Sequence, residues 1–110
     1  MTTQLELAPP APAPALARDA AWLEQLLHGH GRWLTAADIF ELSGKMVDDR
    51  RVRKLASASG WIISGDSGYK HLEHATPEQI EHATSRLESQ AKQMAERAGL
   101  IRRNAHRRIG

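Results

Sequence analysis

The stretch TAADIFELSGKMVDDRRVRKLASAS, residues 35–59, decides the fold, because it contains two short helix patterns joined by a turn. Thr35 with Asp38 three positions later is typical of a capped helix start. That first helix is expected to end at Gly44. Asp48 opens the second pattern, where an acidic side chain favours the positive end of the helix dipole. Two compact helices in close succession are therefore predicted.

A further helix is predicted before this stretch, beginning at Arg18, with Asp19 as its cap. Its apolar residues recur at helical spacing and are Ala20, Leu23, Leu26 and Leu27. Gly29 and Gly31 end this helix. Trp33-Leu34 follows as an apolar piece that is long enough for one or two hydrogen bonds to a strand.

Two β-prone runs, Trp61–Ser64 and Tyr69–Leu72, come after the stretch. Gly65-Asp66-Ser67-Gly68 lies between them, and such a Gly-rich connection is typical of a hairpin. Since the hairpin follows three short helices, its apolar residues are expected to close a small core.

Composition divides the chain into four parts. Residues 1–17 form a Pro/Ala-rich flexible tail, because proline removes hydrogen-bond donors and fixes φ. Residues 18–72 form the compact domain. Thr76, with Pro77 and Gln79 after it, opens a long helix over residues 76–107, and residues 108–110 are a basic terminus.

The order helix, short strand, helix, turn, helix and hairpin resembles small winged helix-turn-helix DNA-binding proteins of phage or prophage type. Thr35–Gly44 is similar to the first helix and turn glycine of many bacterial helix-turn-helix regulators, and Gly60–Gly65 with Gly68–Lys70 is similar to the wing. The resemblance covers half of the chain. It implies a mainly α fold with a small β-wing, plus the long C-terminal helix, and a function in transcription regulation.

One departure from that pattern concerns the turn. Gly44 and Val52, the first buried residue of the next helix, are eight positions apart, whereas the family spacing looks like six. The turn is therefore expected to be longer, and the recognition helix to start differently or to tilt.

The helix over residues 48–59 has the chemistry of a DNA-reading element. At 100° per residue, Val52 and Leu55 share an inner face. The residues on the opposite face, expected to contact bases in the major groove, are Arg50, Lys54 and Ser57. Those expected to contact phosphates are Lys45, Arg51, Arg53 and, on the wing, Lys70. A solvated basic helix is the alternative.

The long helix carries a seam of large and small residues at heptad spacing. We expect this seam to form a homodimer interface, and its residues are Ile80, Thr84, Leu87, Ala91, Met94, Ala98, Ile101 and Ala105. The alternative is that the seam packs back on the compact domain of the same chain. A basic cluster lies at the end of the helix and consists of Arg102, Arg103, Arg107 and Arg108. It is expected either to form a second phosphate contact or only to stabilise the negative end of the helix dipole.

Composition excludes several classes of function. The formal charge is +2, but residues 45–110 carry thirteen basic and eight acidic side chains, which favours an anionic partner. There is no cysteine, no membrane-spanning stretch and no basic N-terminal leader, so a cytoplasmic protein is expected. The six histidines lack metal-ligand spacing, and no catalytic motif or cofactor-binding motif is present, so neither a metal site nor an enzyme is predicted.

A protein-binding adaptor is the alternative to a DNA-binding regulator. A basic surface and a long helix also fit a phage-type protein that binds and modulates a host factor. Charge alone does not separate the two readings.

Overall fold

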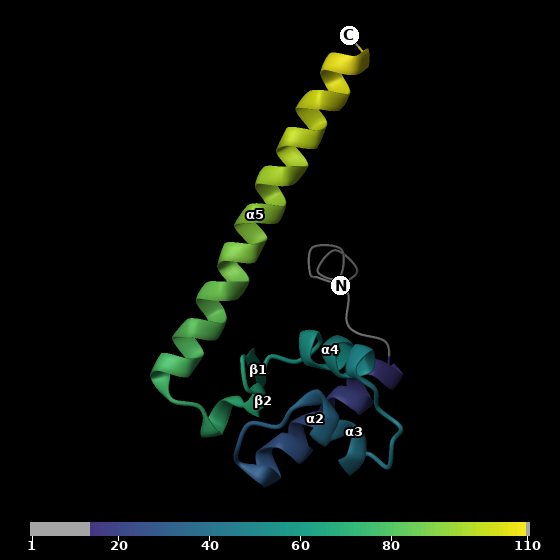
Figure 1. Cartoon of the computed structure of the whole chain (residues 1–110), viewed down its shortest axis with the longest axis vertical. Coiled ribbons are helices and arrows are strands. Elements are labelled where there is room, and N and C mark those ends of the chain that lie inside the picture. The colour runs from purple at the N-terminus through teal and green to yellow at the C-terminus, as the bar shows by residue number, and fades with distance from the viewer. Residues whose placement is uncertain (1–13, 110) are drawn as a thin grey trace, which may run out of the picture. The chain divides into compact units, whose positions relative to one another are not determined.

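The computed structural model describes residues 14–109, with side chains from Ala15 to Arg107, so most of the predicted tail lies outside the described residues. The chain divides between Ala75 and Thr76 into two compact units. The elements, drawn in Figure 1, are α2 (Pro14–His30), α3 (Ala36–Leu42), α4 (Asp49–Ser57), β1 (Ile62–Gly65), β2 (Gly68–His71), the 3₁₀ helix η1 (Leu72–His74) and α5 (Pro77–Ile109). The prediction of a mainly helical protein with a small antiparallel hairpin is confirmed.

Helix α2 begins earlier than expected. It includes Pro14 and the residues up to Ala17 that were expected to belong to the tail. Proline is tolerated in the first turn of a helix, because the N–H that it lacks would have no helical partner there. The cap predicted at Asp19 is therefore wrong: Asp19 lies inside α2, and its carboxylate accepts a hydrogen bond from Arg51.

The core of the first unit is formed by one face of each of α2, α3 and α4 and by Leu34. Its buried members are Ala20, Leu23 and Leu27 from α2, Leu34, Ile39 from α3, and Val52 and Leu55 from α4. Val52 and Leu55 thus lie on the inner face, as predicted. The helical spacing from Ile39 would turn Leu42 toward the core, but Leu42 is 47% exposed.

The helix starts predicted at Thr35 and Asp48 are both capped. Thr35 and Asp38 form a reciprocal capping box at α3, and the carboxylate of Asp48 accepts from the Arg51 N–H at the start of α4. The turn between these helices is built on Ser43. Its Oγ donates to the Phe40 carbonyl at 2.8 Å and accepts from the backbone N–H groups of two later residues. These bonds stabilise the longer turn.

Strands β1 and β2 pair with Ile63 opposite Lys70 and Gly65 opposite Gly68, so the connection is the two-residue turn Asp66-Ser67. Leu34 adds a single bridge on the other side of the hairpin, since its N–H and carbonyl both bond to Tyr69, at 2.9 and 2.8 Å. The short apolar piece at Trp33-Leu34 therefore does make the two hydrogen bonds expected of it.

Helix α5 forms the second unit. Thr76 and Gln79 exchange hydrogen bonds of 3.0 and 3.1 Å, which completes the predicted capping box. The helix runs for 33 residues and continues through Gly99. At 1.5 Å per residue it is about 50 Å long.

Candidate functional site

The outer face of α4 carries the residues predicted to read bases. Arg50, Lys54 and Ser57 are all exposed, opposite the buried Val52 and Leu55. Within the part of the chain that the structure describes, neither Arg50 nor Lys54 forms an ion pair. Ser57 Oγ donates to the Arg53 carbonyl at 2.9 Å, so its proton is engaged while its oxygen remains an acceptor. Two cations are thus available on this face.

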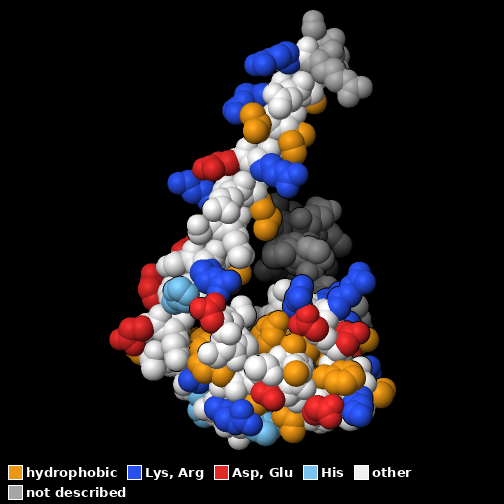
Figure 2. All heavy atoms as spheres, viewed as in Figure 1, with side chains coloured by type: hydrophobic (Ala, Val, Ile, Leu, Met, Phe, Trp, Pro, Cys, Tyr) orange, Lys and Arg blue, Asp and Glu red, His pale blue; other side chains and the backbone are white. Residues whose placement is uncertain are grey.

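The two arginines on the flanks of α4 are engaged in ion pairs. Arg51 donates to Asp19 of α2 at 2.8 Å, and its hydrogen bond holds the pKa of the Asp19 carboxyl below its usual value. Arg53 donates to Asp49 one turn earlier at 2.7 Å. Figure 2 shows acidic and basic side chains next to one another over α4. Arg51 therefore links α4 to α2. The sequence predicted a phosphate contact for Arg51 and did not predict this ion pair.

The remaining predicted DNA contacts of the first unit, Lys45 and Lys70, come before and after α4 in the sequence. Lys45 is exposed in the turn before it, with the left-handed φ of 65° that few residues other than glycine adopt. Lys70 of β2 holds its ammonium 5.4 Å from the centre of the Trp33 ring. A cation held over an aromatic face is positioned by that contact.

Helix α5 exposes its seam and its basic end. The large seam residues Leu87, Met94 and Ile101 are 63%, 69% and 55% exposed. Arg102, Arg103 and Arg107 are exposed, whereas the side chain of Arg108 lies outside the described residues. The helix therefore presents an apolar stripe and a cationic end on one element.

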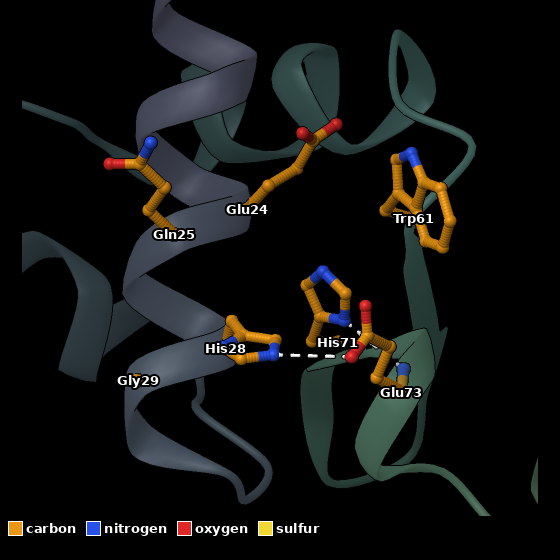
Figure 3. Close-up of a pocket in the computed structure, with 7 residues that line it drawn as sticks. All are labelled: Glu24, Gln25, His28, Gly29, Trp61, His71 and Glu73. Carbon is orange, nitrogen blue, oxygen red and sulfur yellow. Dashed lines mark hydrogen bonds and ion pairs between the residues drawn. The ribbon is translucent and has the colours of Figure 1, made fainter.

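A pocket of about 310 Å³ lies on the first unit and is lined by three elements (Figure 3). Glu24 and His28 come from α2, Trp61 from the segment before β1, His71 from the end of β2 and Glu73 from η1. His28 Nε2 lies 3.3 Å from the Glu73 carboxylate. The rings of Trp61 and His71 stack with centroids 5.9 Å apart.

Two histidines near this pocket form hydrogen bonds at the ends of helices. His71 Nδ1 accepts the Glu73 N–H at 3.1 Å and so caps η1, while His74 Nε2 lies 2.9 Å from the His28 carbonyl near the end of α2. Burial, with help from His28, lowers the pKa of His71. Among residues 14–109, no group of three or more His, Asp or Glu side chains is arranged to hold a metal ion. The sequence reading missed the burial of His71, although its two-residue spacing from Tyr69 places both on one face of β2.

Comparison with known proteins adds no functional assignment. No protein-family model, curated protein or solved structure matches the chain. No helix among the described residues is long and apolar enough to cross a bilayer.

Proposed function

We propose that the first unit is a winged helix-turn-helix domain that binds double-stranded DNA, with α4 in the major groove. In this reading α3 and α4 form the helix-turn-helix, and the β1–β2 hairpin is the wing. Nine residues make α4 about 14 Å long, and the major groove is about 12 Å wide. An element of this size fits the groove with one face still packed on its own core.

The observation that carries the proposal is the pair of exposed cations on the outer face of α4, which form no ion pair with any residue that the structure describes. Arg50 and Lys54 lie one turn apart, opposite the residues that anchor the helix in the core. An arginine or lysine in this position reaches guanine O6 and N7. Lys45 and Lys70, on either side, are suited to phosphates.

Arg51 and Arg53 have a smaller role in this account than their charge implies. Each already pairs with a carboxylate, so a phosphate would have to compete with Asp19 or Asp49. We therefore assign base contacts to Arg50, Lys54 and Ser57, and treat Arg51 as a structural link between α2 and α4. The wing tip, Asp66-Ser67, carries no cation, so the hairpin mainly completes the sheet.

We further propose that the protein acts as a dimeric, phage-type transcriptional regulator. Its apolar seam on α5 provides the dimer interface, and its two-fold symmetry would match a palindromic site. The basic end of α5, with Arg102, Arg103, Arg107 and Arg108, provides a second phosphate contact.

The test compares two charge removals by fluorescence anisotropy on a duplex selected from a random pool. Replacing Arg50→Gln together with Lys54→Gln is expected to weaken binding by at least about 30-fold, because each lost base contact is worth about 1–3 kcal/mol. The matched control is Lys92→Gln on α5, which is expected to change affinity by less than about threefold. Equal losses in both variants would contradict the assignment to α4.

A protein-binding adaptor is the second candidate, and one observation favours it. Leu42 and Met46, at the end of α3 and in the following turn, are 47% and 82% exposed. Large apolar side chains that are exposed within four positions of each other in the chain favour a protein contact there. A stable complex with a protein partner that survives nuclease treatment and is lost in Met46→Ser would support the adaptor reading.

A further inference from the structure

We propose that α5 pairs with α5 of a second copy in antiparallel orientation, with large seam residues packed against small ones. This inference rests on the proposed homodimer and specifies its geometry. A helix of 33 residues whose large apolar side chains are exposed gains most of its stability from packing against a partner. In Figure 2, hydrophobic side chains recur along the exposed length of α5.

The volumes of the seam side chains favour the antiparallel orientation. Large and small seam residues alternate along α5, so a parallel pair would stack Leu87 on Leu87 and Ala91 on Ala91, which gives alternating wide and narrow layers. In an antiparallel pair each large residue meets a small one, and cores pack best when large and small residues face each other. One register satisfies every layer, and it pairs Leu87 with Ala98, Met94 with Ala91 and Ile101 with Thr84.

The charges at the positions that flank the seam also distinguish the two orientations. In a parallel coiled coil, Arg97 of one helix lies beside Arg102 of the other, and like charges in contact oppose association. In the antiparallel register, Arg102 instead lies beside Glu81 of the partner helix, twice in the symmetric dimer. The charge pattern therefore disfavours the parallel pair and favours the antiparallel one.

The charge gradient along the helix supports the same choice. Residues 94–109 carry five arginines and one glutamate, whereas residues 77–93 carry three glutamates and two basic residues. Antiparallel pairing places each basic half against the more acidic half of the other helix. Parallel pairing would place the two basic halves side by side.

This geometry determines where the two compact units attach. The two Thr76 residues would lie at opposite ends of the helix pair, about 50 Å apart along its axis. The antiparallel dimer therefore attaches its two compact units at opposite ends of the helix pair.

Cysteine cross-linking of the full chain tests the orientation, since the natural sequence contains no cysteine. Thr84→Cys and a tagged Ile101→Cys chain are mixed and oxidised. The antiparallel register predicts a mixed disulfide between the two variants and none between two Thr84→Cys chains, whose sulfurs would lie about 25 Å apart along the helices. A disulfide between two Thr84→Cys chains would overturn the antiparallel orientation while leaving the dimer intact.

Sedimentation of full-length chains tests the dimer itself. Met94→Glu in the seam is expected to raise the dimer dissociation constant by more than about 100-fold, whereas Ser89→Glu on the outer face leaves it unchanged. Glu81→Arg and Arg102→Glu alone each weaken the dimer by about tenfold, and the two together restore it. A wild-type chain that stays monomeric at 100 times the concentration used for DNA binding would overturn the inference, and it would leave the DNA-binding proposal for each unit to be judged by its own test.

Discussion

Among the described glycines, Gly68 has the least room for a side chain. Its φ is 118°, which L residues rarely adopt, and a Cβ built there would lie 2.2 Å from the Leu34 carbonyl oxygen. The contact arises because Leu34 bridges to the neighbouring Tyr69. A methyl group would therefore disrupt both the turn and the bridge.

We expect Gly68→Ala to lower the free energy of unfolding by about 3 kcal/mol or more, from backbone strain and overpacking together. The matched control is Gly29→Ala in α2, where no atom lies within 4 Å of the added Cβ. That change should raise stability by up to about 1 kcal/mol, because alanine favours a helix over glycine. Urea denaturation of both variants measures the difference, and a neutral Gly68→Ala would contradict the close approach.

His71 makes the stability of the fold dependent on pH. Its lowered pKa means that the unfolded chain binds a proton more readily than the folded one, and protonation of Nδ1 would also remove the acceptor that caps η1. The contribution of His71 is therefore fully present above the ordinary pKa of 6.5 and is lost as pH falls through the lower folded value.

We expect the melting temperature to fall between pH 7.5 and pH 5, and His71→Asn to flatten that decline. Asparagine keeps an oxygen that can cap η1 but does not titrate. His82→Asn, on exposed α5, serves as the control and should leave the decline unchanged. Thermal melts followed by circular dichroism supply the data, and an unchanged slope in His71→Asn would show that another group is responsible.

At the scale of the elements, local signals predicted structure well and tertiary contacts escaped prediction. The capping boxes at Thr35 and Thr76 depend on residues three positions apart, so the sequence alone was sufficient. The ion pair of Asp19 with Arg51 joins residues 32 positions apart, and nothing local indicated it. Leu42 shows the same limit, because its helical spacing from Ile39 favours the core, whereas its side chain is 47% exposed.

The sequence predicted the face of α4 on which the candidate residues lie, but not the contacts they make with other elements. Helical periodicity correctly placed Arg50 and Lys54 opposite Val52 and Leu55. It did not distinguish engaged from available cations, because that depends on carboxylates supplied by α2 and by the first turn of α4. The histidine-lined pocket was missed, since its residues come from α2, β2 and η1 and meet only when the unit folds.

At the scale of the whole molecule, we assign different roles to the two units. The first unit offers a small packed core with an exposed basic helix face, and α5 offers an unpaired apolar seam with a charge gradient. In this proposal the first unit and the basic end of α5 contact DNA, whereas the apolar seam of α5 pairs two copies of the chain.

The most direct test of the central claim, DNA binding through α4, is a titration of labelled random duplex DNA at about 50 and 200 mM salt. Six or more phosphate contacts in the dimer predict a loss of affinity of about a thousandfold between these conditions. Replacing Arg50 and Lys54 with glutamine should weaken binding at both salt concentrations. Absence of binding at the lower salt concentration, or an affinity that does not change with salt, would contradict the account.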